Sequence, residues 1–287
     1  MVYLNTTLQP KFYFRVRSMD RERVKDYAIK SSLASTVQEV LDILEADDGK
    51  SFEEKKAAAV GLLRKGKEAP LAEALVDFAV ADTVGKTTKE SFWDAGPISC
   101  PNAGLVLRKV EEADRDGYIR LQKEYNLMKS MLKEEAYCDM VWKEHQEQKA
   151  LMLSIIKDGQ YIGYCGIKNT AQEPWELAIE ILPEWTNQGI GRIAIAGMLD
   201  AVKARLGIME FRVRIDPGNH ASQKMFEKLG AIPNGISEFL IHDKATLEKC
   251  EEDNLHLIDA DTISLAARFG VEPRKLLSHI LEYSLPW

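Results

Sequence analysis

The sequence has few residues that would bind a metal or form disulfides. It contains four cysteines and five histidines in 287 residues. No two cysteines form a C-x-x-C pair, and the histidines have neither HExxH nor HxxxH spacing. These absences argue against a structural zinc site and against a disulfide framework. We therefore expect a protein without a metal cofactor.

Long apolar runs and an excess of positive charge are also missing. The N-terminal residues have no apolar segment of the signal-peptide type, and no apolar run approaches the roughly 18 residues of a membrane span. The formal net charge is -7. An acidic chain matches polyanions poorly, which argues against nucleic acid as a partner, and no membrane partner is expected. The default expectation is a cytoplasmic protein.

The first third of the chain is expected to be mainly helical. Residues 12–16 alternate in polarity and predict one short strand. Ser51 and Glu54 have the spacing of a capping box at the start of a helix. Residues 1–96 contain no catalytic motif, so their role is unassigned beyond packing or dimerisation. Prolines and glycines in residues 95–104 then predict a linker.

After residue 104 the pattern changes to strands and helices mixed in one sheet, in the order β-α-α-β-β-β-α-β-α-β. Asp158-Gly159 lies between two apolar runs and predicts a hairpin. The last strand is expected at residues 236–241. We place this mixed α/β (α+β) domain at residues 104–258. A helical C-terminal tail is expected at residues 259–287, with one helix over residues 273–283.

The segment from Ile181 to Arg192 lies between a predicted strand and a predicted long helix. Its glycines let the backbone approach a ligand closely. The amides of residues 187–192 would then point at one spot beside the positive end of the helix, where a pyrophosphate fits and Arg192 adds charge. A Rossmann motif is excluded because Ala194 occupies the third glycine position, and a P-loop is excluded because it lacks Gly-Lys-Ser/Thr.

Two motifs in this region resemble the GNAT (Gcn5-related N-acetyltransferase) superfamily. Ile181-Leu182-Pro183 is similar to the family's V-x-P strand end, and Gly189-Ile190-Gly191 is similar to its coenzyme A loop. Thr186 stands where the family usually has Arg or Gln. Downstream, Asn219 begins an N-x-x-A/S turn, followed by a helix that ends Glu227-Lys228-Leu229-Gly230. The sequence of this second motif looks most like the branch of the family that acetylates the N-termini of ribosomal proteins.

The resemblance implies a GNAT fold, with a mostly antiparallel sheet flanked by helices. It also implies acetyl-CoA, or another short acyl-CoA, as co-substrate, and a primary amine of a small molecule, peptide or protein as acceptor. Acetyl transfer would occur by direct attack in a ternary complex. The residues expected to bind the coenzyme are Ile181, Leu182, Pro183, Asn187, Gln188, Gly189, Ile190, Gly191, Arg192, Asn219, Ser222 and Phe226.

Catalysis needs a base, because an amine attacks a thioester only in its neutral form and free amines have pKa values of about 8 to 10. The family often places this base on the strand before the coenzyme loop, and the candidates there are Glu180 and Glu176. The family's acid is a tyrosine at the position of Phe226, which has no hydroxyl. Ser222 is the next candidate for protonating the leaving thiolate, and Tyr164 is a third. The oxygen of the thioester would be bound by a backbone amide near Ile181 or Leu182.

Two other functions fit the same sequence. The missing tyrosine and Thr186 also suit a catalytically weak or inactive acyl-CoA sensor or scaffold. Residues 263–280 have a helix-turn-helix character, which would suit a toxin- or antitoxin-type protein acting on tRNA or another protein. The acidic net charge argues against nucleic acid, so a tail that packs on the domain or completes a homodimer is preferred.

Overall fold

A computed structural model describes residues 40, 42–44, 46, 48–65, 76, 88–147, 149–239 and 241–287. The strand predicted at residues 12–16 lies outside the described residues. In the N-terminal region, helix α4 (Phe52–Leu63) begins with the predicted capping box: the Ser51 side chain accepts from the Glu54 amide, and the Glu54 side chain accepts from the Ser51 amide. The capping-box prediction is confirmed.

Within the described residues the chain forms an eight-stranded sheet in the order β1-β2-β3-β4-β5-β6-β8-β7. All neighbouring strands are antiparallel except β5 and β6, which are parallel. The mixed, mostly antiparallel sheet is the fold class that the sequence predicts. The strands are β1 (Ile98–Cys100), β2 (Leu105–Lys109), β3 (Leu151–Lys157), β4 (Gln160–Ile167), β5 (Trp175–Ile181), β6 (Glu210–Ile215), β7 (Ile232–Ser237) and β8 (Ile280–Pro286).

Strands β5 and β6 pair only at their beginnings. Their register joins Trp175 to Phe211 and Glu176 to Arg212, and no later residues of the two strands pair with each other. On its other edge β5 stays paired with β4 as far as Leu182, whose amide donates to the Ile162 carbonyl. The sheet therefore opens between the carboxyl-terminal halves of β5 and β6.

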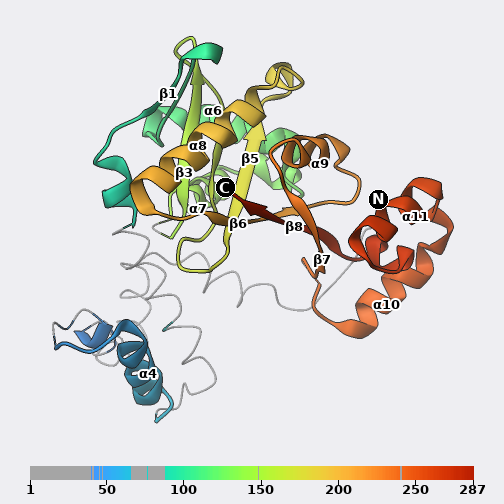
Figure 1. Ribbon diagram of the computed structural model, residues 1–287, viewed down its shortest axis with the longest axis horizontal. Helices are drawn as coiled ribbons and strands as arrows, with labels where there is room; N and C mark the ends of the chain where they lie inside the picture. Colours follow the sequence, from blue (N-terminus) through green and yellow to red (C-terminus); the bar gives the residue numbers. More distant parts are fainter. Residues whose placement is uncertain are drawn as a thin grey trace.

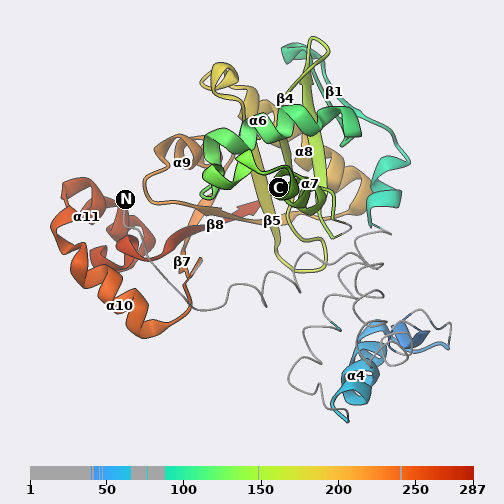
Figure 2. The ribbon, with the colours of Figure 1, turned by 180° about the vertical axis from the view of Figure 1, so that it is seen from behind.

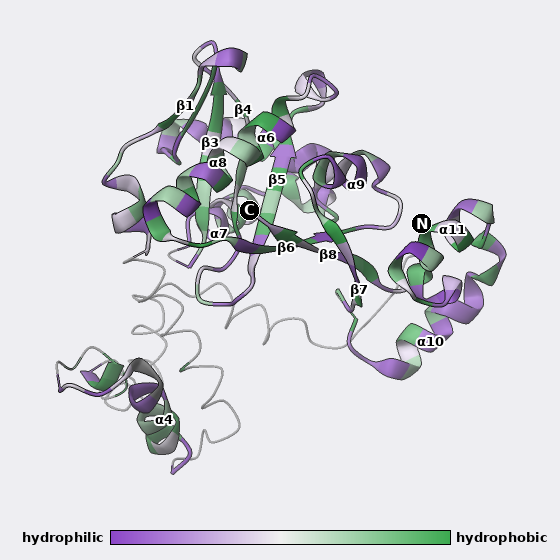
Figure 3. Cartoon of the chain, viewed as in Figure 1, coloured by the Kyte–Doolittle hydropathy of each residue, from purple (hydrophilic) through white to green (hydrophobic). Residues whose placement is uncertain are grey.

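Helices cover both faces of the sheet (Figures 1 and 2). Helix α8 (Ile190–Leu206) lies on one face, and α6 (Arg115–Tyr125) with α7 (Glu135–His145) lies on the other. Helix α9 (His220–Glu227) follows β6. The 3-10 helices η3 (Glu112–Asp114) and η4 (Lys129–Lys133) lead into α6 and α7. Apolar colour runs along the central strands in Figure 3, where the two cores lie under these helices.

Two local predictions between residues 95 and 160 have different outcomes. The Asp158-Gly159 hairpin is confirmed: it joins β3 to β4, and the φ angles of 50° and 77° are those of a type I′ turn. The predicted linker is only partly irregular, because Ile98–Cys100 form β1 against β2. Just before it, Phe92 is buried in the main core, and Arg205 of α8 donates to the carbonyls of Phe92 and Gly96.

The C-terminal segment differs from the prediction. Helices α10 (Lys244–Asp253) and α11 (Ala260–Phe269) form, but the helix predicted over residues 273–283 is wrong. A short 3-10 helix, η7 (Pro273–Leu277), is followed by strand β8, which inserts between β6 and β7. The reason is packing: Leu281, Tyr283 and Leu285 alternate with less buried residues and fill the core. The strand predicted at 236–241 is β7, which lies earlier and ends at Ser237.

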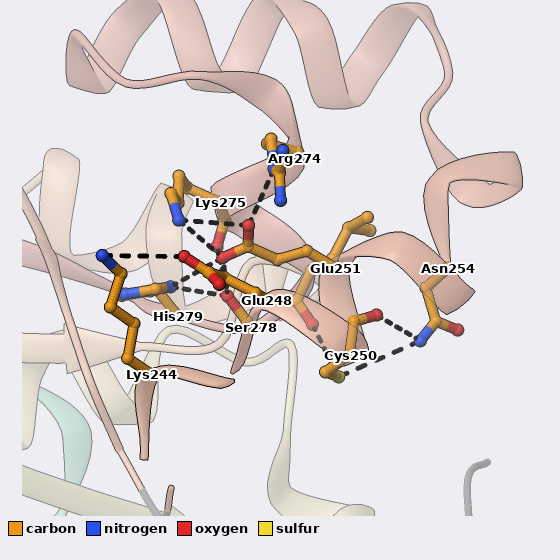
Figure 4. Close-up of polar contacts among 10 residues, drawn as sticks. Lys244, Glu248, Cys250, Glu251, Asn254, Arg274, Lys275, Ser278 and His279 are labelled. Atoms are coloured by element: carbon orange, nitrogen blue, oxygen red, sulfur yellow. Dashed lines mark hydrogen bonds and ion pairs between the residues drawn. The ribbon is translucent and has the colours of Figure 1, made fainter. Parts of the chain in front are cut away.

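The connection from α10 to β8 is organised around Glu251, whose side chain is 0% exposed. Its carboxylate accepts from Arg274 Nε at 2.8 Å, Lys275 Nζ at 2.9 Å and Ser278 Oγ at 2.8 Å (Figure 4). Burial by itself would raise the pKa of this carboxyl, but the hydrogen bonds from Lys275, Ser278 and Arg274 hold it below its usual value. The ionised acid thus fixes the segment that enters β8.

Candidate active site

The loop before α8 has the backbone geometry of an anion cradle. Asn187 and Gly189 adopt left-handed conformations, with φ angles of 59° and 75°. Gly189 is the N-cap of α8, and no side chain caps this end of the helix. The amides of the first turn are therefore left for a ligand, at the positive end of a 17-residue helix.

A second glycine of this loop allows close packing. A Cβ atom at Gly191 would lie 2.8 Å from Met225 Sδ and 3.4 Å from the Cδ1 atoms of Ile179 and Ile181. The end of β5, the start of α8 and helix α9 therefore meet at Gly191, beside the opening between β5 and β6.

The predicted coenzyme residues around this loop fall into two groups. Pro183, Asn187, Gln188, Gly189 and Arg192 are exposed, and Ile190 is buried beneath them. Ile181 and Leu182 precede them in the chain. Successive backbone amides of a strand point to opposite edges of that strand. The Leu182 amide bonds to β4, so the Ile181 amide points to the other edge of β5, toward the opening. The Leu182 side chain is 2% exposed, and its amide is already bonded to β4.

The predicted residues of the second motif lie at the start of α9. The Asn219 side chain is the N-cap of this helix, and its Oδ1 accepts from the Ser222 amide at 3.1 Å. Ser222 lies half-buried in the first turn. Phe226 is 3% exposed and packs in the main core, because it lies on the buried stripe of α9 with Gln223.

Glu180 lies on the α6/α7 face of β5. It stands directly opposite Tyr164 of β4, whose hydroxyl bonds its carboxylate. Gln122 of α6 donates from Nε2 to Glu180 Oε2 at 2.8 Å. Burial raises the pKa of Glu180 from 4.5 to about 6, although the hydrogen bonds from Tyr164 and Gln122 and the charge of Lys168 oppose this.

Tyr164, which bonds Glu180, is part of a cluster of aromatic rings. The Tyr118 ring stacks on His145 with the ring centroids 4.0 Å apart, and His145 meets Tyr164 edge-on at 4.6 Å. Tyr164 is among the residues predicted from the sequence, as a candidate acid, whereas Gln122 is not. One signal for Gln122 is present in the sequence: it interrupts the apolar stripe of α6 one turn after Tyr118.

Helix α6 is fixed to the sheet through Asp114, which is 2% exposed. Its carboxylate accepts from Arg108 of β2, at 2.7 and 2.8 Å, and from Ser154 Oγ of β3 at 2.7 Å. Arg108, Ser154, Tyr164 and Glu180 are successive cross-strand partners. One row of residues across the sheet therefore carries both the anchor of α6 and the acid that α6 contacts.

Glu176, the other candidate base, has different surroundings. Its carboxylate contacts Lys168 Nζ at 2.6 Å, Arg214 Nε at 2.9 Å and Arg212 Nη2 at 3.2 Å. Burial by itself would raise the pKa of Glu176, but Lys168 and then Arg214 hold it below its usual value. Glu176 links β5 to β6 at the point where the two strands are still paired.

A family model described as the Acetyltransferase (GNAT) domain matches residues 104–232. This match covers the opening, the loop before α8 and the Asn219 motif. Residues 104–232 belong to the GNAT acetyltransferase family. The GNAT resemblance found from the two motifs is confirmed.

Similar proteins are found beyond the family model. A Bacillus subtilis (strain 168) protein assigned as a ribosomal protein bS18 alanine N-acetyltransferase is 34% identical over 87 residues. That alignment spans 29% of this chain and 55% of the relative, so the chain covers about half of the relative's length.

Solved structures also match. Mycobacterium smegmatis RimJ in complex with CoA-disulfide has 16% identity and a TM-score of 0.45, covering 67% of this chain and 86% of that chain. RimL, a ribosomal L7/L12 alpha-N-protein acetyltransferase, has 14% identity and a TM-score of 0.46, covering 66% of this chain and 97% of that chain. The GNAT match ends at residue 232, so α10, α11 and β8 lie outside it.

The described residues lack two kinds of feature. They contain no group of three or more His, Cys, Asp or Glu side chains arranged to hold a metal ion. Of the helices in the described ranges, none has both the length and the apolar character needed to cross a membrane.

Proposed function

We propose that this chain is an N-acetyltransferase that moves an acetyl group from acetyl-CoA to a primary amine within a ternary complex. The observation that carries the proposal is the position of Glu180. This acid with a raised pKa lies on the strand that runs into the coenzyme loop, at the edge of the opening between β5 and β6.

Glu180 acts as the general base. A carboxyl with a pKa of about 6 is mostly ionised at neutral pH and is a stronger base than an ordinary glutamate. It accepts the proton that the attacking amine loses, directly or through one water. Tyr164 and Gln122 hold the carboxylate in place but leave it acceptor capacity. Glu176 has a structural role instead, because three cations neutralise it.

The coenzyme binds between β5 and β6, with its pyrophosphate on the amides at the start of α8. Asn187, Gln188, Gly189, Ile190, Gly191 and Arg192 form this cradle, next to Pro183. The amide of Ile181 faces the opening and donates to the thioester oxygen as negative charge develops there. Asn219 contacts the coenzyme chain, and Ser222 protonates the leaving thiolate. Leu182 and Phe226 are left out because one is bonded to β4 and the other is in the core.

The acceptor is the amino group of a peptide or protein, in line with the Bacillus subtilis relative. Exposed apolar side chains surround the expected entrance, namely Tyr125, Leu127, Met128 and Met131 between α6 and α7. The Tyr125 hydroxyl donates to the Ile181 carbonyl at 3.0 Å, which places this group beside the open edge of β5. A peptide main chain and its first side chain would contact these residues.

The domain boundaries also follow from contacts. Phe92 is part of the core, and β8 completes the sheet between β6 and β7. We therefore extend the acetyltransferase unit to begin near residue 88 and to include residues 280–286. Residues 244–279, which include α10, α11 and η7, then form a helical insertion before the last strand.

The test combines binding and turnover on the full chain. Calorimetric titration with acetyl-CoA should give saturable binding, and release of free coenzyme A thiol should follow addition of a suitable amine. The amine panel contains peptides that begin with alanine or serine, the same peptides with blocked N-termini, and polyamines. Turnover only with free N-termini supports the proposal. Binding without turnover on any amine would favour a coenzyme-A sensor, and no binding would contradict both functions.

A further inference from the structure

A cavity of about 330 Å³ lies at the end of the sheet away from the coenzyme loop. Its walls come from four places: Lys89 and Trp93 before β1, Lys109 and Val110 at the end of β2, His145 at the end of α7, and Met152 of β3. Glu180, Tyr164 and the residues of the coenzyme loop do not line it. The cavity is therefore distinct from the proposed acetyl-transfer site.

Residues outside the GNAT match close this cavity. Lys89 and Trp93 precede residue 104, where the match begins. Lys89 Nζ donates to the carbonyl of Gln146 at 3.3 Å and to that of Glu147 at 2.5 Å, so this segment is joined to the end of α7. The segment before β1 thus forms one wall of the cavity, on the acetyltransferase domain.

His145 carries the strongest sign of a ligand. It is 5% exposed, and its Nε2 atom is buried without a hydrogen-bond partner while the residue lines the cavity. Buried polar atoms of folded proteins are nearly always hydrogen-bonded, so an orphaned one that lines a cavity indicates a missing partner. Burial, followed by the charge of Lys89, lowers the pKa of His145 to about 3, so the ring is neutral. A neutral imidazole can donate from Nε2 when the proton is on that atom.

The walls also define the chemistry of the ligand. Lys89 and Lys109 supply positive charge, while the acidic side chain of Glu90 is exposed at the same site. Trp93, Val110 and Met152 supply apolar surface. The volume is at the small end of the range of about 300 to 1,000 Å³ that ligand sites occupy. These features suit a small anion with an apolar body.

We propose that this cavity binds a small carboxylate with an apolar or aromatic body, whose carboxylate accepts a hydrogen bond from His145 Nε2. The lysines at the cavity balance the charge, and the body of the ligand packs against Trp93, Val110 and Met152. A charge-assisted bond to a buried donor is roughly twice as strong as a neutral one, so the carboxylate should decide affinity.

The experiment uses phenylacetate as the probe, with phenylacetamide and 2-phenylethylamine as neutral and cationic analogues. Binding to the full chain is measured by calorimetry or ligand-observed NMR. We expect saturable binding of phenylacetate, and at least about tenfold weaker binding of both analogues, because a tenfold change corresponds to about 1.4 kcal/mol. No saturable binding of phenylacetate, or equal affinity for phenylacetamide, would overturn the proposal.

Variants locate the site. His145→Phe keeps an aromatic ring in the stack with Tyr118 and removes Nε2, so phenylacetate should bind about tenfold more weakly. Lys109→Gln should weaken binding because it removes an exposed charge at the cavity, and it avoids any change in the core. Lys244→Gln is the matched control, since this lysine is 88% exposed on α10. Unchanged affinity in both His145→Phe and Lys109→Gln would contradict the assignment.

The outcome is independent of acetyl transfer. Acetyl-CoA titrated into the phenylacetate complex should bind as it does to the free protein, because the two sites share no residue. Displacement of phenylacetate by acetyl-CoA would overturn the proposal of a separate site. Failure of acetyl-CoA to bind at all would contradict the proposed function. The phenylacetate titration would still test the cavity site independently.

Discussion

Replacing Glu180 with glutamine separates the proposed chemistry from binding. Glutamine keeps the size of the side chain and its contacts with Gln122 and Tyr164, but it cannot accept a proton from the amine. A positioned general base contributes about 100- to 10,000-fold to rate, and we expect kcat/KM to fall by that factor. Acetyl-CoA affinity should stay within about twofold, because Glu180 lies on the face of β5 opposite to the side chains that contact Gly191.

The same substitution should make the protein more stable. The pKa of Glu180 rises from 4.5 to about 6 on folding, a difference equivalent to about 2 kcal/mol. Below pH 4.5 the carboxyl is protonated in both the folded and the unfolded state, and the wild type loses nothing. The loss of stability appears as pH rises from 4.5 to about 6 and is complete above that range. Glu180→Gln should therefore gain up to about 2 kcal/mol at pH 7 and about nothing at pH 4.

The assay is the ratio of wild-type to variant kcat/KM as a function of pH, with chemical denaturation of both proteins at pH 4 and pH 7. Ionisation of the amine substrate cancels in this ratio. We expect a constant ratio above pH 7 and a fall of about tenfold per pH unit below about pH 6. A ratio that stays flat from pH 5 to pH 8, or a variant that is less stable at pH 7 than the wild type, would refute the role and the burial argument respectively.

Three other predictions test the surroundings of the site and the tail. Tyr164→Phe removes a hydrogen bond that favours the ionised carboxylate, so the break in the kcat/KM profile should move above about pH 6; a break at lower pH would show that this bond is misassigned. Gly189→Ala and Gly207→Ala place alanine at φ angles of 75° and 74° at the two ends of α8, and each should lower the free energy of unfolding by about 1 kcal/mol. Only Gly189→Ala should weaken acetyl-CoA binding in calorimetry. Equal acetyl-CoA affinities of the two variants would argue against the anion cradle. Glu251→Gln should lower the stability by about 2 kcal/mol at pH 7, whereas Glu248→Gln on the exposed side of α10 should not. Because the pKa of Glu251 is lowered, the difference in stability between wild type and Glu251→Gln should shrink as pH falls below 4.5. A difference that persists there would contradict the ion-pair account.

Local signals in the sequence predict much of this fold. Asp158-Gly159 gives the hairpin because its dihedral angles suit few other residues, and the Ser51–Glu54 spacing gives the start of α4. The glycine loop before α8 was also recognisable, since an anion cradle depends on backbone freedom more than on distant partners. Such features are encoded within a few residues of chain.

Features that depend on distant partners were missed or left open. Glu176 and Glu180 lie four residues apart on one face of β5, and the choice between them depends on the arginines of β6 and on Gln122 of α6. Residues 280–286 contain a period-two pattern, but the predicted helix covers residues 273–283, because the strands on either side of β8 are far away in sequence. Phe226 matched a family position by sequence, while its burial is a property of the assembled core.

The position of β8 has a consequence for biosynthesis. Strand β7 pairs with β8, and β8 fills the gap beside β6, although both neighbours are made earlier. A ribosome adds about 5 to 20 residues per second. The free edge of β6 and all of β7 therefore lack their pairing partner for several seconds, until residues 280–286 have been synthesised. Open strand edges invite pairing with other chains, which makes this nascent intermediate a substrate for chaperones. A recombinant fragment that stops at residue 232, where the GNAT match ends, would keep that open edge permanently and should aggregate.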